Sequence, residues 1–195
     1  MQKTLECLAK AYLGESQARN RYTFYAKVAS DDGFEEIAAI FRETADQEKE
    51  HAKKLFLSMQ TLKKKSPTPQ PDLKIMDVEV PLAFGTTLEN LKAAAAGENY
   101  EHGTMYPEFA SIAEQEGEKE IALLFRSIRK AEIHHEGRYR KLIKVVESDT
   151  VFKKEKPTTW ICRECGYEHE GTEPPQKCPL CGKPKSFYQT KKEEY

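Results

Sequence analysis

Two Glu-x-x-His pairs carry the strongest chemical signal in the sequence: Glu48 with His51, and Glu132 with His135. Residues three apart on a helix share a face, so each pair can aim a carboxylate and an imidazole at one point. The pairs lie 84 residues apart, counted from Glu48 to Glu132. Two such pairs, with one inward-facing glutamate from each of two further helices, form the ligand set of a carboxylate-bridged di-metal centre in a four-helix bundle.

The two halves of the chain match each other as an internal repeat. Early positions match at an offset of 83, including Glu15 with Glu98, and later positions match at an offset of 84, including Tyr22 with Tyr106. A duplicated helical hairpin places equivalent ligands about a pseudo-two-fold axis. The repeat therefore adds Glu15 and Glu98 to the predicted site.

The change of offset marks one residue gained between Glu98 and Tyr106, in a stretch that also holds an extra carboxylate, Glu101. A residue inserted into a continuous helix usually appears as a π-bulge, and such bulges favour functional sites. Pro107 fits this position, because a widened turn before it relieves the clash of its ring with the preceding turn. We predict an irregular turn within residues 98–107 of the third helix.

Four helices must position these residues. The first is expected from Thr4 to Ser30, and Asp32-x-x-Glu35 predicts a capping box for the second. A Pro-rich segment, residues 66–71, and an extended connection to Gly85 then lead to the third helix, which is capped by Thr86-x-x-Glu89 and reaches about Gln115. The fourth runs from Gly117 to about Glu147 or Ser148. So long a connection makes the second and third helices parallel, which predicts an all-α ferritin-like four-helix bundle with a long crossover.

Length and charge bound the possible functions. The 195 residues suffice for one substantial domain and a small one, and the net charge of −1 gives no reason to expect nucleic acid or a membrane surface as a partner. The N-terminal residues lack the apolar core of a signal peptide, and no stretch approaches the roughly 20 apolar residues of a membrane span. A cytoplasmic protein is expected.

The C-terminal segment is a second, independent signal, with the spacing of two metal-binding knuckles, Cys162-x-x-Cys165 and Cys178-x-x-Cys181. So short a segment cannot bury enough apolar surface alone, so a bound metal must supply much of its folding free energy. Disulfides are the rival explanation, but paired knuckles without a secretion signal favour a metal. A tetrahedral four-cysteine site accepts zinc or iron, and taken alone it favours zinc.

The expected division is therefore a four-helix bundle over residues 1–148, a Lys-rich linker over 149–158 and a four-cysteine domain over 159–195. An extended linker of about a dozen residues spans at most roughly 40 Å. The C-terminal domain could therefore dock on its own bundle or on a neighbouring subunit.

Taken together, the bundle motifs and the four-cysteine segment resemble the rubrerythrin family over nearly the whole chain. The segments that carry the resemblance are Gly14–Tyr22, Glu48–Ala52, Gly97–His102, Glu132–Glu136 and the two knuckles. The resemblance implies a non-haem di-iron site in the bundle, a rubredoxin-like iron centre in the tail, and reduction of hydrogen peroxide to water. It also favours iron over zinc in the tail, because a redox metal suits an electron relay.

The resemblance also implies roles for individual residues. The expected catalytic residues are the seven expected metal ligands of the bundle: Glu15, Glu48, His51, Glu98, Glu101, Glu132 and His135. One iron would be held by Glu15 and the other by Glu98 and His135, with Glu48 and Glu132 bridging the two. His51 and Glu101 would compete for the first iron, since a diferric site favours a further carboxylate and a diferrous site tolerates an imidazole. The tail iron would be held by Cys162, Cys165, Cys178 and Cys181.

The partners implied by the resemblance are hydrogen peroxide and a redox donor, either a rubredoxin or an NAD(P)H-dependent flavoprotein reductase. A head-to-tail homodimer is expected, in which the tail of one chain lies against the bundle of the other.

Two other functions stay open from the residues. An iron-storage protein would use the same bundle but has no use for a four-cysteine relay, and a zinc-ribbon interaction module would leave the bundle without metal. Tyr22 and Tyr106 are either core aromatics or hydrogen-bond donors to ligand carboxylates. His102 and His134 are expected to be exposed or to contact the ligands from outside, and Cys7 to be a buried free thiol.

Overall fold

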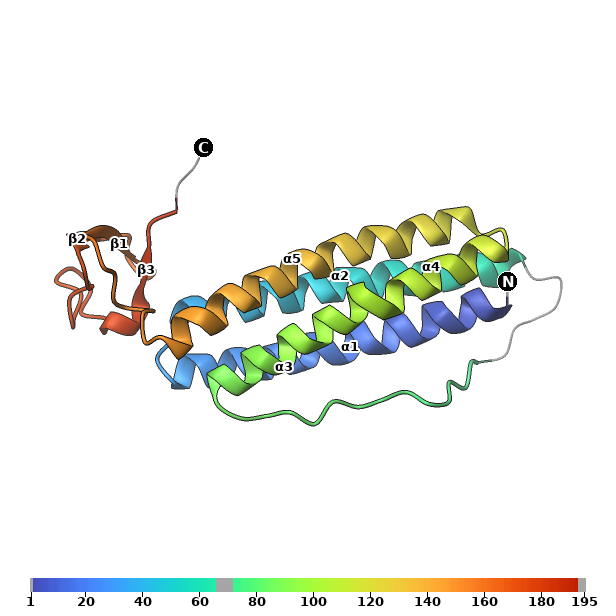
Figure 1. Ribbon diagram of the computed structural model, residues 1–195, viewed down its shortest axis with the longest axis horizontal. Helices are drawn as coiled ribbons and strands as arrows, with labels where there is room; N and C mark the ends of the chain where they lie inside the picture. Colours follow the sequence, from blue (N-terminus) through green and yellow to red (C-terminus); the bar gives the residue numbers. More distant parts are fainter. Residues whose placement is uncertain (1, 66–71, 193–195) are drawn as a thin grey trace.

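The computed structural model describes residues 2–65 and 72–192. Four long helical rods form a bundle. They lie side by side, and a small β domain lies beyond one end of the bundle (Figure 1). The rods are α1 (Gln2–Asp31), α2 (Glu35–Lys65), a third rod made of α3 (Thr87–Tyr100), η1 (Glu101–Met105) and α4 (Tyr106–Gln115), and α5 (Lys119–Glu147). The all-α ferritin-like architecture predicted from the sequence is confirmed.

The turn between α1 and α2 differs from the expected one. Gly33 has φ +85°, a left-handed conformation that glycine adopts without steric cost. Asp32 does not form the predicted capping box with Glu35. Instead, its carboxylate accepts hydrogen bonds from the Thr87 backbone N–H at 3.0 Å and from the Thr87 hydroxyl at 2.6 Å. The turn of the first hairpin therefore caps the start of α3, which also has its predicted capping box, Thr86 with Glu89.

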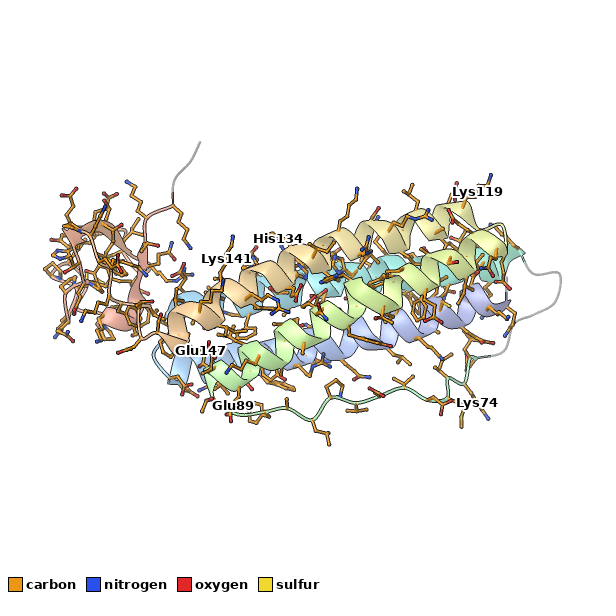
Figure 2. All side chains as sticks on the ribbon, viewed as in Figure 1. Lys74, Glu89, Lys119, His134, Lys141 and Glu147 are labelled. Carbon is orange, nitrogen blue, oxygen red and sulfur yellow. The ribbon has the colours of Figure 1, made fainter. Side chains whose placement is uncertain are left out.

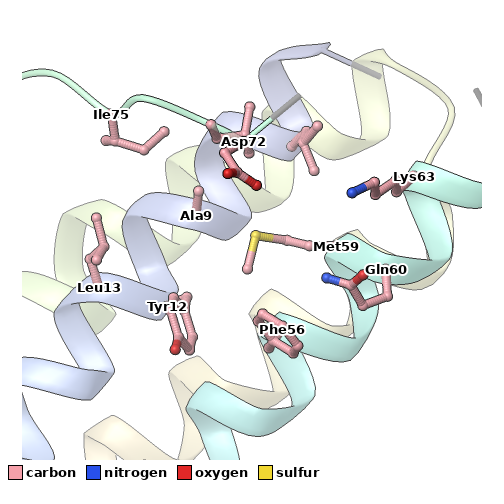
Figure 3. A pocket seen from close by; sticks show the side chains of 11 residues that line it. Ala9, Tyr12, Leu13, Phe56, Met59, Gln60, Lys63, Asp72 and Ile75 are labelled. Atoms are coloured by element: carbon pink, nitrogen blue, oxygen red, sulfur yellow. The ribbon is translucent and has the colours of Figure 1, made fainter. Parts of the chain in front are cut away.

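From residue 72 to Gly85 the connection runs outside the bundle and along it, and α2 and α3 are parallel (Figure 1). The predicted irregular segment at residues 66–71 lies outside the described residues. Further along, the Tyr25 hydroxyl donates to the Ala83 carbonyl at 2.7 Å, which fastens the extended chain to α1. Leu73 and Ile75 close a cavity of about 300 Å³ against α1 and α2, lined also by Tyr12, Phe56 and Met59 (Figure 3).

The irregular turn predicted in the third rod is present. Residues Glu101–Met105 form a π-helix, in which the Tyr106 N–H donates to the Glu101 carbonyl five residues earlier. Pro107 follows directly in the first turn of α4. One extra residue is therefore accommodated without ending the rod, as the change of repeat offset indicated.

The bundle core has two apolar clusters with a polar layer between them. Leu8 on α1, Leu55 on α2 and Phe125 on α5 belong to the first cluster. Tyr22 on α1 and Phe41 on α2 belong to the second. On every rod the predicted ligands fall between the positions that contribute to the two clusters. The site is thus enclosed from both ends by packed side chains.

The C-terminal domain holds a three-stranded antiparallel sheet in the order β2-β1-β3. Its elements are β1 (Thr158–Cys162), β2 (Glu168–Gly171), a short 3-10 helix η2 (Lys185–Phe187) and β3 (Tyr188–Thr190). Its core is small and consists of Trp160, Tyr188 and two of the cysteines, Cys162 and Cys178.

This domain contacts the end of its own bundle where α1 turns into α2. Phe152, in the linker segment before the domain, stacks on Phe34 with ring centroids 6.1 Å apart, and Lys192 Nζ of the domain lies 3.0 Å from Glu36 Oε1. Within residues 2–65 and 72–192, no helix is long and apolar enough to cross a membrane.

Candidate di-metal and four-cysteine sites

The bundle brings six of the seven predicted site residues together in its centre. They form two overlapping groups whose ligand atoms lie within 4.8 Å of one another: Glu15, Glu48, His51 and Glu132 in one, and Glu48, Glu98, Glu132 and His135 in the other. Glu48 and Glu132 are common to both groups. The arrangement is that of two adjacent cation positions bridged by two carboxylates.

Distances within the cluster follow the pseudo-two-fold symmetry of the repeat. His51 Nδ1 lies 2.8 Å from Glu48 Oε2, 3.1 Å from Glu132 Oε1 and 3.5 Å from Glu15 Oε2. His135 Nδ1 lies 2.7 Å from Glu132 Oε2, 3.1 Å from Glu48 Oε1 and 3.6 Å from Glu98 Oε2. Each imidazole thus faces both bridging carboxylates and one carboxylate of its own half.

Although these oxygen and nitrogen atoms lie close together, they do not have the geometry of hydrogen bonds. Eight buried polar atoms in the cluster have no hydrogen-bond partner: one oxygen each of Glu15 and Glu98, both oxygens of Glu48 and Glu132, and Nδ1 of His51 and His135. Buried polar atoms are almost always paired, so such a concentration needs an explanation. Ligands about 2.1 Å from one cation and at right angles to each other lie about 3 Å apart, which is the spacing seen here. The residues therefore fit a pair of metal ions.

The pKa values of the metal-free cluster also indicate a site for metal ions. Burial first, and then the neighbouring carboxylates Glu48 and Glu132, raise the pKa of Glu15 well above its usual value. Burial is also the largest influence on Glu98, whose pKa is raised to about 8. Although burial alone would lower it, contacts with Glu132, Glu48 and Glu98 raise the pKa of His135 to about 12. The site without metal therefore holds protons in place of the positive charge that metal ions would bring.

The seventh predicted residue, Glu101, lies outside both groups. It is buried, and its pKa is raised well above the usual value by burial and by the charges of Glu98 and Glu15. It occupies the first position of η1, and its Oε1 lies 3.9 Å from the position that a Cβ on Gly14 would take. The structure thus places His51, and not Glu101, among the converging ligand atoms.

Tyr22 and Tyr106 combine the two alternatives left open by the sequence. Both are fully buried core aromatics, and both donate hydrogen bonds to cluster carboxylates. The Tyr22 hydroxyl on α1 donates to Glu98 Oε1 on α3, and the Tyr106 hydroxyl on α4 donates to Glu15 Oε1 on α1. Each half of the repeat therefore orients the terminal glutamate of the other half.

Sequence reasoning missed Gln47. His135 is 2 % exposed, and its Nε2 lies 2.9 Å from Gln47 Oε1, which fixes the ring so that Nδ1 faces the cluster carboxylates. His51 has 17 % of its side chain exposed. The repeat gave no signal for Gln47, because the matching position in the second half is Ala131.

The remaining candidates lie where the sequence suggested. His134 is exposed on the outer side of α5 (Figure 2). His102 is half-buried, with Nε2 2.8 Å from Glu136 Oε2. Cys7 is a buried free thiol, and burial raises its pKa to about 11, which makes it a poor nucleophile.

The four tail cysteines converge as a second site. Their sulfurs lie within 4.8 Å of one another, with Cys162 Sγ 3.7 Å from Cys181 Sγ and Cys165 Sγ 3.6 Å from Cys178 Sγ. All four are free thiols, which contradicts the disulfide alternative. Sulfurs about 2.3 Å from a tetrahedral metal ion lie about 3.8 Å apart, so the set fits a metal centre with four thiolate ligands.

Glycines shape both knuckles of this site. Gly166 and Gly182 follow the second cysteine of each pair at φ +75° and +76°. Their N–H groups donate to the carbonyls of Cys162 at 2.8 Å and Cys178 at 2.9 Å. The left-handed conformation closes each turn around the metal position.

Comparisons with known proteins agree with this geometry. The family model described as Rubrerythrin matches residues 6–143, and the one described as the rubredoxin-like domain of rubrerythrin matches residues 160–189. A putative rubrerythrin of Methanocaldococcus jannaschii is 54% identical over 100% of this chain and 96% of its own. A rubrerythrin of Porphyromonas gingivalis is 45% identical over 99% of this chain and 92% of its own.

Among solved structures, nigerythrin in a fully reduced, all-ferrous state is similar, with 31% identity and a TM-score of 0.63 over 96% of this chain and 86% of that one. Sequence, fold and both clusters of metal-ligating residues thus lead to one assignment: the chain belongs to the rubrerythrin family of oxidoreductases, with a carboxylate–histidine bundle site and a rubredoxin-like four-cysteine domain.

Proposed function

We propose that the protein is a non-haem di-iron peroxidase that reduces hydrogen peroxide to two molecules of water. The reaction consumes two electrons and two protons, and the electrons would pass through iron in the four-cysteine site. The observation that carries the proposal is the buried carboxylate–histidine cluster with eight unpartnered polar atoms, in a chain that also holds a four-cysteine site. The bundle over 1–148, linker over 149–158 and four-cysteine domain over 159–195 are the proposed working parts.

The proposed ligand set follows the two groups of converging atoms. Glu15 and His51 would hold one iron, Glu98 and His135 the other, and Glu48 and Glu132 would bridge them. Glu101, buried nearby, is proposed as the alternative to His51 when the first iron is oxidised. Two bound ferrous ions would supply one electron each to the peroxide.

Side chains around the site would keep these ligands in place. Tyr22 and Tyr106 orient Glu98 and Glu15, and Gln47 fixes His135. The apolar clusters on both sides exclude bulk water from the centre of the bundle. His51 is the most exposed of the six grouped ligands, which makes its side of the cluster the proposed entry for peroxide.

Electron return supports a second chain as the partner. The C-terminal domain contacts Glu36 of its own α2, and at about 1.5 Å per helical residue Glu36 lies about 18 Å from Glu48 along the axis. The four-cysteine site lies in the domain beyond Glu36, so its distance from the bundle cluster of the same chain is larger still. Electron transfer between these two centres of one chain would therefore be slow. We therefore propose a head-to-tail homodimer, with a rubredoxin or an NAD(P)H-dependent flavoprotein reductase as the external donor.

Metal analysis of protein purified without oxygen tests the proposal. About three irons per chain are expected, two in the bundle and one in the tail. Reductant should bleach the iron–thiolate absorption, and peroxide should restore it. Zinc in the tail with a bundle free of metal would instead support an interaction module.

A pair of variants assigns the activity to the cluster. Glu132→Ala should abolish peroxide consumption and leave the iron–thiolate spectrum unchanged. Glu50→Gln, on the exposed face of α2, is the matched control and should retain activity. Equal activity of the Glu132→Ala variant and the unmodified chain would refute the proposed site.

A further inference from the structure

The π turn that carries Glu101 contains a backbone carbonyl that the helix itself cannot satisfy. In this turn the Tyr106 N–H donates to the Glu101 carbonyl, five residues earlier. In the same register, the His102 carbonyl would accept from the nitrogen of residue 107. That residue is Pro107, which has no N–H. The widened turn and the proline together leave the His102 oxygen without a donor from its own rod.

A side chain of the neighbouring rod supplies the missing donor. Arg129 Nε on α5 donates to the His102 carbonyl at 2.8 Å. Further along the same face of α5, the Glu136 carboxylate contacts the His102 ring at 2.8 Å and is itself held by Arg140 Nε at 2.6 Å. Because 129 and 136 are seven residues apart, both side chains lie on one face of α5. This face therefore holds His102 by its backbone and by its side chain.

The contacts that hold His102 affect the carboxylate–histidine cluster through Glu101, which directly precedes His102 and is the first residue of the π turn. Closing the turn to a regular helix would rotate Glu101, together with α3, relative to Tyr106 and the rest of α4. We propose that Arg129 is a positioning residue, which caps the carbonyl left free by Pro107 and so keeps the π turn, and with it Glu101, in place. The importance of Glu101 rests on the proposed function, but the capping does not.

Amide hydrogen exchange on the full chain, loaded with ferrous iron without oxygen, tests the proposal independently of turnover. The N–H groups of Met105 and Tyr106 report on the turn. Arg129→Ala should speed their exchange up to about tenfold, the loss expected for one hydrogen bond, with little change in α1 or α2. Arg129→Lys, which keeps one donor, should restore part of the protection.

Pro107→Ala gives the decisive comparison, because it returns the N–H that can donate to the His102 carbonyl. In this background, Arg129→Ala should change the exchange by about twofold or less, since one hydrogen bond replaces the other. Pro107 borders a surface hollow of about 460 Å³ that Arg126 and Arg129 also line, so loss of its ring leaves no void in the core.

Arg126→Ala is the matched control, because Arg126 lies one turn from Arg129 on α5 and makes an exposed ion pair with Glu114. It should not alter exchange at Met105 or Tyr106. Equal effects of Arg126→Ala and Arg129→Ala would overturn the proposal. So would an effect of Arg129→Ala that is unchanged by Pro107→Ala. The Mössbauer spectrum of the bundle irons links the turn to the site: in oxidised protein, Arg129→Ala should change the signal of one iron and leave the other as it was.

If peroxide consumption by the unmodified chain fails, the proposed function falls and the exchange result stands. If the exchange result fails, only the role of Arg129 falls.

Discussion

At the scale of single residues, the cluster is an arrangement that only positive charge can stabilise. Glu15, Glu98 and Glu101 all have raised pKa values because they are buried beside other carboxylates. In the protein without metal, bound protons neutralise these carboxylates, and in the protein with metal the cations do so. Metal binding and proton release are therefore linked at this site.

This linkage predicts a pH-dependent release of protons on metal binding. Glu98, with a pKa of about 8, is mostly protonated at pH 7 and must lose its proton to bind a metal ion. At pH 9 it is already ionised, so fewer protons should be released. Titration of metal-free protein with Zn²⁺ in weak buffer, followed by a pH indicator, measures the difference. In the Glu98→Gln variant the difference between pH 7 and pH 9 should shrink, while the contribution of the four cysteines stays the same.

The tyrosine hydroxyls give a second prediction. Tyr22→Phe and Tyr106→Phe each remove a donor from a buried carboxylate and should weaken metal binding in the bundle roughly 10- to 100-fold. Equilibrium dialysis against Mn²⁺ measures the affinity. Tyr25→Phe is the control, because the Tyr25 hydroxyl bonds the Ala83 carbonyl and no cluster residue. Similar losses in all three variants would show a general packing effect and not an effect of the carboxylate contacts.

Much of the residue-scale picture could be predicted from spacing, because ligands repeated at i and i+3 leave a pattern in the sequence. Six of the seven predicted site residues converge, and Glu101 lies beside them. Gln47 and Arg129 could not be found in this way. Each acts on a residue of another rod, with no partner in the repeat, and only the packing of the helices brings the pairs together.

At the scale of elements, the sequence predicted what depends on neighbours along the chain. The π turn was visible as one extra residue before Pro107, and the Thr86–Glu89 box caps α3 as expected. The Asp32 capping box was wrong for a physical reason. Its local pattern fits the start of α2, but Asp32 bonds to Thr87, 55 residues away, and so satisfies the first backbone N–H of another helix.

The contact between Asp32 and Thr87 predicts a measurable stabilisation of the bundle. Asp32→Ala should lower the free energy of unfolding by about 1 kcal/mol, the usual value for a lost helix cap. Asp31→Ala is the neighbouring control, since Asp31 makes only an exposed ion pair with Lys27, and it should cost at most about 0.5 kcal/mol. Urea unfolding at a fixed metal content, followed by helical circular dichroism, compares the two. Equal losses would mean that Asp32 does not cap α3.

At the scale of the whole molecule, the two parts of the chain are stabilised differently. The bundle has two apolar clusters that pack around the polar centre, so its helices have a core with or without metal. The C-terminal domain has four buried core residues, and two of them are cysteines of the metal site. Few contacts join the two parts, and those described lie at the α1–α2 end of the bundle.

Metal removal should therefore unfold the C-terminal domain before the bundle. Trp160 is the one tryptophan in the sequence, it is 1 % exposed, and its Nε1 donates to the Gly171 carbonyl at 2.9 Å. Its fluorescence thus reports on the domain alone, while helical circular dichroism reports on the bundle. A chelator strong enough to strip the four-cysteine site should shift the Trp160 emission to longer wavelength and leave most of the helical signal, because a domain this small folds around its metal.

Cys181→Ser should produce the same emission with no chelator, whereas Cys7→Ser, in the bundle core, should leave it unchanged. If Trp160 stays buried after the metal is gone, the sheet is stable by itself, and metal binding at the four-cysteine site contributes little folding free energy.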